Sequence, residues 1–322
     1  MRVLFFLIVL GMAAPLAAQP FDLAPGIAHY NARRWADAHA FFANTTRAQP
    51  RNVDAVIWYG RTLLSENKPG DAKDWFEKAT KLAPRSSEAQ LWLGRAIGVQ
   101  AATANPLRQP FLARRLKKAV DRAIELDPEN IDARELRWRF YAMAPAVMGG
   151  GEGHAREEVA EILKRNRYRG LLLSANTSTR AKDFVTAERH FRAAVSEHPD
   201  SLGAASVYAS WLAERDRPAD AFAVIDSYQK RRPSDPQSLY QVGRLAAATG
   251  QQLDRGEEAL RKYLAAPPPP ALSAPSLSTV HLRLGGIAER RGNTAAARAA
   301  YEQALKIDPR SNQARRALDR LK

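Results

Sequence analysis

The chain contains no cysteine, and this absence narrows its chemistry. Without a thiol it can form no disulfide, no thiolate metal site and no cysteine nucleophile. Runs of β-branched residues are also short, while Ala, Leu, Arg and Glu dominate, so helix is favoured over most of the length. The composition predicts an all-α protein that is held together by helix packing alone.

Long hydrophobic runs are missing beyond the first residues. Met1–Arg2 is a basic start, Val3 to Met12 is a short apolar run, and small residues follow up to Ala18. This layout is typical of a secretory signal peptide, whereas an anchor helix would need an apolar run of about 20 residues. We therefore expect residues 1–18 to be a signal peptide and residues 19–322 to form a periplasmic or secreted protein that does not span a membrane.

Acidic residues are scarce relative to basic ones. The chain has 49 Lys and Arg against 34 Asp and Glu, a net charge of +15 at pH 7. A field of this size favours anionic partners. Nucleic acid is the usual partner of so basic a chain, but the export signal and the absence of a nucleic-acid motif argue against it. We expect a protein or peptide partner with acidic segments, or anionic components of the cell envelope.

Motifs for catalysis and for metal binding are missing as well. The six histidines are scattered and no pair has the spacing of a helical zinc site, and no serine lies in a Gly-x-Ser-x-Gly turn. The glycine run Gly149–Gly153 lacks the Lys–Ser/Thr of a phosphate loop and favours a flexible turn between helices. The sequence predicts a protein that is not an enzyme, with no metal and no cofactor.

An internal repeat is the strongest signal that is present. Pro50 and Pro84 lie 34 residues apart, and the segment between them carries Gly60, Ala72, Phe76 and Ala79. Later segments repeat these offsets at Gly94, Ala123 and Pro128, at Ala187, Phe191, Ala194 and Pro199, at Ala209, Ala221, Ile225 and Pro233, and at Gly285, Ala297, Tyr301, Ala304 and Pro309. A period of 34 is typical of a helix–turn–helix repeat. Small residues allow two helices to cross closely, the aromatic residue fills the gap beside them, and proline ends the second helix.

The chain resembles the tetratricopeptide repeat family over nearly all of its length after residue 18. The resemblance rests on Val56–Gly60 through Pro84, Leu91–Gly94, Ala187–Phe191, and Leu284–Gly285 through Pro309. It implies an α-solenoid of about eight helix pairs that winds into a right-handed superhelix, with a capping helix at 311–322. The departures from the repeat are insertions near 100–109 and 143–153 and a Pro-rich linker at 267–275, which we expect to be stiff and extended.

The resemblance also implies which residues line the concave face, because the first helix of each pair lies there. The residues at or near inward-facing positions are Trp58, Arg61, Trp92, Arg95, Arg139, Arg169, Asn176, Tyr240 and Arg244. Arginine grips carboxylates with two parallel hydrogen bonds, and tryptophan is an apolar anchor. The alternative is that these arginines pair with Glu88, Asp132 and Glu135 within the fold. The set of Lys, Asn and Arg with which some family members hold acidic C-terminal tails is not present as a complete pattern.

Two functions from different classes fit these observations. The first is a non-enzymatic scaffold that holds a protein or peptide in a basic, aromatic groove during the assembly or organisation of a bacterial envelope complex. The second is an accessory component of periplasmic solute uptake, or a carrier of an anionic small ligand, which the glycine-rich insertion favours.

Overall fold

The computed structural model describes residues 22–321, and every regular element in that range is helical. Seventeen α-helices form eight successive pairs and a final single helix, which confirms the predicted all-α repeat architecture. The first four pairs are α1 (Ala24–Asn31) with α2 (Trp35–Ala48), α3 (Val53–Ser65) with α4 (Pro69–Leu82), α5 (Ser87–Thr103) with α6 (Gln109–Leu126), and α7 (Ile131–Met143) with α8 (Glu152–Arg165). The next four are α9 (Arg167–Arg180) with α10 (Phe184–Glu197), α11 (Leu202–Ala213) with α12 (Pro218–Arg231), α13 (Pro236–Thr249) with α14 (Leu253–Ala265), and α15 (Leu277–Arg290) with α16 (Thr294–Ile307). Helix α17 (Asn312–Arg320) ends the array.

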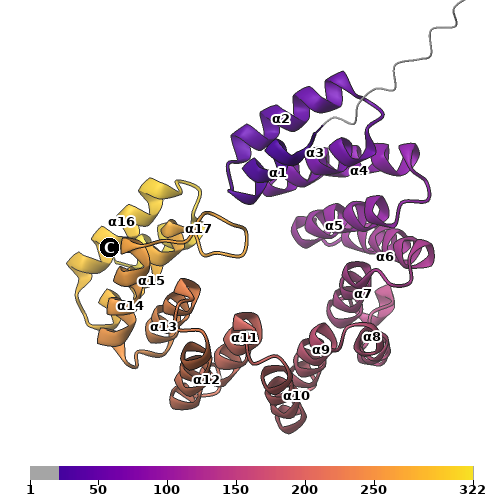
Figure 1. Cartoon of the computed structure of the whole chain (residues 1–322). Coiled ribbons are helices and arrows are strands. Elements are labelled where there is room, and N and C mark those ends of the chain that lie inside the picture. Colours follow the sequence, from indigo (N-terminus) through magenta and orange to yellow (C-terminus); the bar gives the residue numbers. More distant parts are fainter. Residues whose placement is uncertain (1–21, 322) are drawn as a thin grey trace, which may run out of the picture.

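The pairs follow one another around an arc that nearly closes on itself (Figure 1). From α5 to α13 the first helix of each pair lies on the inner side of the arc and the second helix on the outer side. The first helices therefore present their residues toward a common inner face, as the resemblance implies.

Capping side chains fix where the first helices begin. The side chain of Asn52 accepts a hydrogen bond from the backbone N–H of Ala55 at 3.0 Å, and Ser86 accepts one from Ala89 at 3.1 Å. Apart from α1, which has no side-chain cap, the other first helices and the final helix begin in the same way, at Asn130, Asn166, Ser201, Asp235, Ser276 and Ser311. Proline disfavours helix in the residue before it, so the proline two positions before most of these caps ends the preceding helix.

The crossing within a pair depends on a glycine facing a ring. A Cβ atom placed on Gly60 of α3 would lie 2.6 Å from the ring of Phe76 on α4, closer than carbon atoms approach one another. Ala72, Phe76 and Ala79 are fully buried beside it. Gly285 faces the ring of Tyr301 in the eighth pair in the same way. The small residues of the repeat therefore allow the two helices to cross closely, and the aromatic residue fills the space beside them, as their spacing predicts.

The insertion in the third pair lengthens its helices. The insertion near 100–109 is not a loop over its whole length: α5 runs on to Thr103 and α6 begins at Gln109, with 17 and 18 residues against 13 and 14 in the second pair. Alanines at 101 and 102 continue the helix because alanine is the best helix former. The connection is confined to residues 104–108, where Pro106 disfavours a helical residue before it.

The fourth pair has the other irregular connection. Helix α7 ends at Met143, and the chain then forms a short 3₁₀ turn, η1 (Ala146–Met148). Gly149 follows in the left-handed region with φ of 88°, where a residue without a Cβ is strongly favoured. The glycine run is therefore a turn that leads into α8.

One side chain joins the two ends of the arc. Arg33, in the turn between α1 and α2, donates hydrogen bonds from Nη2 to the carbonyl oxygens of Leu272 at 3.1 Å and of Ala274 at 2.9 Å. These acceptors lie in the proline-rich connection between α14 and α15, which is not helical from Ala266 to Ser276 and bends at 272–274. We call this contact the Arg33 latch. It closes the first seven pairs into a ring.

The membrane topology rests on the described helices alone. Of the helices within 22–321, none combines the length and the apolar character needed to cross a bilayer. The predicted signal peptide, residues 1–18, lies outside the described residues.

Candidate binding site

Four of the predicted groove residues form one stack across α3 and α5. The guanidinium carbon of Arg61 lies 3.5 Å from the ring centroid of Trp58 and 4.5 Å from that of Trp92, and the guanidinium carbon of Arg95 lies 4.4 Å from Trp92. Each arginine follows its tryptophan by three positions, which puts the two on one helix face. The 34-residue period then brings Arg61 between two tryptophans. We call Trp58, Arg61, Trp92 and Arg95 the Trp–Arg stack.

Arg61 is held in this stack without an acidic partner. Its Nε is buried and has no hydrogen-bond partner among residues 22–321, and no carboxylate in that range lies within ion-pair distance of it. Burial lowers its pKa, while Tyr30 and Glu88 oppose that shift. Because the ordinary pKa of arginine is above about 12, Arg61 stays charged at neutral pH. A cation–π contact holds the cation but leaves hydrogen-bond donors unsatisfied.

The next helices continue the stack as ion pairs. Arg95 Nη2 lies 3.5 Å from Asp132 of α7, and Arg169 Nη2 of α9 donates to the other oxygen of Asp132 at 2.6 Å. Arg169 also donates to Glu135, and these bonds raise its pKa. The alternative of pairing within the fold therefore holds for Arg169 fully and for Arg95 in part. It does not hold for Arg61.

Arg139 and Asn176 are the exposed members of the predicted set. Arg139 lies on α7 and Asn176 on α9, and the side chain of neither makes a hydrogen bond or an ion pair with another residue in 22–321. Burial lowers the pKa of Arg95; Asp132 opposes this shift, and the charge of Arg139 adds to it. Arg139 is thus an available cation beside the Trp–Arg stack.

Tyr240 and Arg244 of α13 lie apart from this group. Tyr240 is only 8% exposed, and its ring centroid is 6.4 Å from that of Tyr263, so it packs in the core and leaves little surface for a partner. Arg244 donates to Gln241 at 2.8 Å and to the carbonyl of Ser206 at 3.2 Å, and its burial lowers its pKa. The core packing takes up most of the ring, and the place of Tyr240 in the groove stays a prediction.

The sequence reasoning missed a second stacked arginine. The guanidinium carbon of Arg215 lies 4.1 Å from the centroid of Trp211 and 4.4 Å from that of Phe184, and its Nε is also buried without a partner among the described residues. Arg215 follows the end of α11, outside the helix positions that the repeat assigns to the inner face. Its spacing of four from Trp211 is the signal that could have found it.

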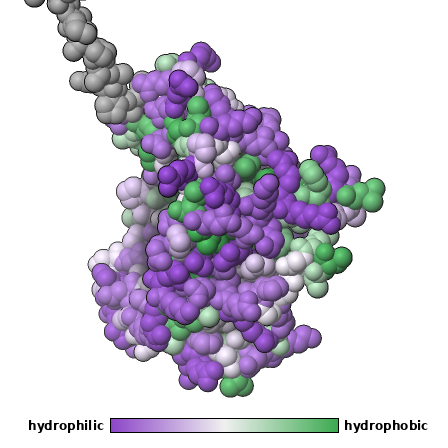
Figure 2. All heavy atoms as spheres, turned by 90° about the vertical axis from the view of Figure 1, so that its right-hand side faces the viewer, coloured by the Kyte–Doolittle hydropathy of each residue, from purple (hydrophilic) through white to green (hydrophobic). Residues whose placement is uncertain are grey.

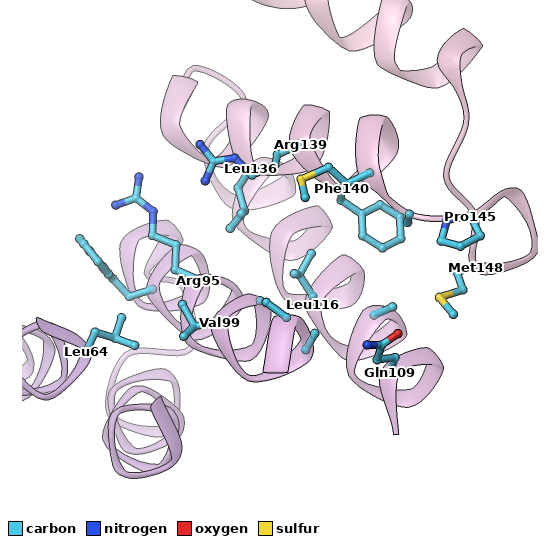
Figure 3. A pocket seen from close by; sticks show the side chains of 17 residues that line it. Leu64, Arg95, Val99, Gln109, Leu116, Leu136, Arg139, Phe140, Pro145 and Met148 are labelled. Atoms are coloured by element: carbon cyan, nitrogen blue, oxygen red, sulfur yellow. The ribbon is translucent and has the colours of Figure 1, made fainter. Parts of the chain in front are cut away.

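The sequence reasoning also missed a pocket between α5, α6, α7 and η1. It has a volume of about 710 Å³, within the range of small-molecule sites. Figure 3 shows Arg95 and Arg139 at one end of it and Gln109 and Met148 toward the other. The lengthened helices α5 and α6 and the connection after α7 build this pocket, which no repeat template predicts.

The outer surface near this region is mostly hydrophilic, with separate hydrophobic side chains standing out from it (Figure 2). Several of the large apolar side chains that the chain exposes come from the irregular connections and the helix ends beside them: Val99, Leu107, Phe111, Met143 and Val147.

Comparison with known proteins agrees with the fold. A family model described as tetratricopeptide repeat matches residues 23–87 and 179–236, and a second model of the same description matches residues 278–311. A sequence relative is the cellulose synthase operon protein C of Pseudomonas fluorescens (strain SBW25), 33% identical over 159 residues. That match covers 48% of this chain and 12% of the relative, so the chain spans a small part of that protein.

Solved structures share the helical solenoid. The yeast Tom70 structure matches with a TM-score of 0.65 and 12% identity over 93% of this chain and 62% of that chain. A tetratricopeptide repeat protein of Thermus thermophilus matches with a TM-score of 0.52 and 19% identity, over 59% of this chain and 96% of that chain. At these identities the likeness concerns the fold alone.

Proposed function

This chain belongs to the tetratricopeptide repeat family, and we propose that it is a non-enzymatic scaffold that binds an acidic segment of a protein partner. The binding surface is the Trp–Arg stack together with Arg139. Proteins of this family are generally non-catalytic binding scaffolds, and no group of His, Asp and Glu that could hold a metal ion occurs within residues 22–321.

Arg61 carries the proposal. Its guanidinium is fixed between Trp58 and Trp92, yet no carboxylate of the described chain pairs with it. A carboxylate of a partner would neutralise this guanidinium, which has no ion pair within the described chain, although the buried Nε itself lies out of a partner's reach. Because the rings of Trp58 and Trp92 already hold the guanidinium in place, binding of a partner costs little side-chain entropy. Arg139 adds a second cation without a partner in the described chain.

We also propose that the protein acts in the cell envelope, in the assembly or organisation of a complex there. The predicted signal peptide supports export, and the absence of cysteine is compatible with an oxidising compartment. The name of one relative, cellulose synthase operon protein C, is compatible with a role in an envelope complex.

Affinity capture from a native envelope fraction tests the surface. Baits are the wild-type chain, a variant with Arg61, Arg95 and Arg139 all changed to Glu, and a control with Arg51, Arg85 and Arg114 changed to Glu. The control residues are exposed and lie in turns or on α6, so both variants change the net charge equally. We expect one dominant partner that binds the wild type and the control equally. The captured amount of this partner should fall at least tenfold with the first variant and should fall with added salt.

Circular dichroism must first show that each bait is folded. Arg139→Glu alone is a second probe, because the Arg139 side chain makes no hydrogen bond or ion pair within the described chain that the change would break. The same partners on all three baits would refute the binding surface.

A further inference from the structure

The pocket between α5, α6, α7 and η1 combines an apolar interior with cations at one end. Its lining is mostly Ala, Leu, Val, Met, Pro and aromatic side chains, and the only charged residues in it are Arg95 and Arg139. Two of its apolar side chains are left open to solvent, Met143 at 70% exposure and Val99 at 43%. A ligand that covers them would remove apolar surface from water.

The few polar groups of the lining are at its two ends. Figure 3 places Arg95 and Arg139 together at one end, while Gln109 lies far from them and donates its side-chain N–H to the carbonyl of Ala104 at 3.1 Å. Trp92 turns its indole N–H to Glu88, at 3.3 Å. The middle of the pocket therefore offers no side-chain hydrogen bond to a ligand.

This distribution selects among anionic ligands. An extended peptide carries an N–H and a carbonyl at each residue, and those groups would stay unpaired in the apolar middle, at a cost. A linear acyl chain has no such groups. Its anionic head would lie between two guanidinium groups, which match a carboxylate with paired hydrogen bonds.

The cationic end is also prepared for an anion. Arg139 has no acidic partner in residues 22–321, and Arg95 shares Asp132 with Arg169, which takes the shorter contact, 2.6 Å against 3.5 Å. Two guanidinium groups at one end of an apolar cavity repel one another, and a bound anion would relieve that repulsion.

We propose that this pocket binds a single-chain fatty-acid carboxylate, with the head group at Arg95 and Arg139 and the acyl chain along Leu136, Leu116 and Phe140 toward Met148. The pocket does not depend on the proposed protein partner, although Arg95 and Arg139 belong to both surfaces. A purified chain without any partner is therefore sufficient to test it.

Calorimetric titration of the purified wild-type chain with octanoate, decanoate and laurate is the first measurement. We expect one site per chain and an affinity that rises about fourfold for each methylene added, the factor that corresponds to burying one methylene. Dodecyltrimethylammonium, with the same chain and a cationic head, should not bind. An affinity that does not change with chain length, or no binding of laurate, would overturn the proposal.

Three variants locate the site. Arg139→Gln should weaken laurate at least tenfold, whereas Arg114→Gln on the exposed face of α6 should leave it unchanged. Ala102 lines the pocket and is exposed, so Ala102→Trp should fill the cavity and abolish binding without disturbing the core. Equal laurate binding by all of these variants would show uptake elsewhere on the surface and would overturn the assignment.

The source of the acyl chain is tested with bilayers. Vesicles of an anionic phospholipid should not displace laurate from the chain, because their acyl chains are not free to enter the pocket, even though the excess of basic residues attracts the chain to an anionic surface. Sedimentation with vesicles in the absence of laurate binding would contradict the pocket and indicate a membrane-surface interaction instead.

Discussion

Two arginines of the predicted groove have opposite environments. Arg61 lies between the rings of Trp58 and Trp92, whereas Arg169 is bound by Asp132 and Glu135. The residue on the neighbouring helix decides between them, since a ring stacks with a guanidinium and a carboxylate neutralises it. The sequence places both arginines toward the inner face but cannot give these distances, which is why pairing within the fold remained an open alternative.

The glycine at the helix crossing predicts how a single substitution changes the stability of the fold. Gly60→Ala should lower the free energy of unfolding by about 1–3 kcal/mol, because the added Cβ overlaps the ring of Phe76 and the core must shift. The matched control is Gly153→Ala in the first turn of α8, where a Cβ meets no atom within 4 Å. The control should be neutral or more stable, by up to about 1 kcal/mol.

Urea unfolding followed by circular dichroism measures both changes. Equal stability of Gly60→Ala and the wild type would mean that the close approach of α3 and α4 is not required.

Between elements, one carboxylate ties three helices together. Glu188 of α10 accepts hydrogen bonds from the hydroxyl of Tyr208 on α11 at 2.9 Å, from Arg192 at 2.7 Å and from Arg217, which precedes α12, at 2.8 Å. The bond from Arg217 is the largest of the effects that lower the pKa of Glu188 to about 2. The fifth and sixth pairs are thus joined by charge as well as by apolar packing.

This shift predicts the stability of the fold against acid. A carboxyl group with a lowered pKa in the folded state stabilises fully above its unfolded pKa of about 4.3, and the contribution is lost as the pH falls through about 4 toward 2. Glu188→Gln should therefore lower the free energy of unfolding by about 1 kcal/mol at pH 7, since solvent screening limits what these ion pairs contribute. The stability of this variant should also depend less on pH between 5 and 2.

Glu302→Gln, at an exposed position on α16, is the control and should match the wild type across that range. Thermal melts at intervals of half a pH unit would reveal the difference. Parallel pH profiles for Glu188→Gln and the wild type would refute the role of the network.

The helix pairs could be predicted from the sequence because each depends on residues a few positions apart. Gly60 with Phe76, and proline followed by Ser86, are local signals with a direct physical reason. The greater length of α5 and α6 could not be predicted, because the alanine-rich insertion is compatible with a loop as well as with longer helices. Only tertiary packing selects between the two. The pocket depends on that outcome and on η1 together, so it was not predicted either.

For the whole molecule, the Arg33 latch is a contact across about 240 residues. No repeat period brings Arg33 to Leu272 or Ala274, because the proline-rich connection that carries the acceptors departs from the repeat. It arises only from the sum of the turns between seven successive pairs. The sequence therefore predicts an arc but not its closure.

The latch can be tested by distance measurement. The natural chain has no cysteine, so spin labels can be attached to single cysteines introduced at Ala36 and Ser273, both exposed. Arg33→Ala should broaden and lengthen the distance distribution while lowering the free energy of unfolding by only about 1 kcal/mol. Arg34→Ala, next to it, should leave the distribution narrow, and a narrow distribution in both variants would show that the ring does not need the latch.

The latch also changes how the array can come apart. In a linear stack of repeats, each unit is supported only by its neighbours, so loss of structure begins at an end, where one neighbour is missing. Joining the first pair to the connection after the seventh gives that end a second neighbour. Arg33 thus makes the first seven pairs a closed cycle. The first pair is then supported on both sides and should not be the first part of the array to unfold.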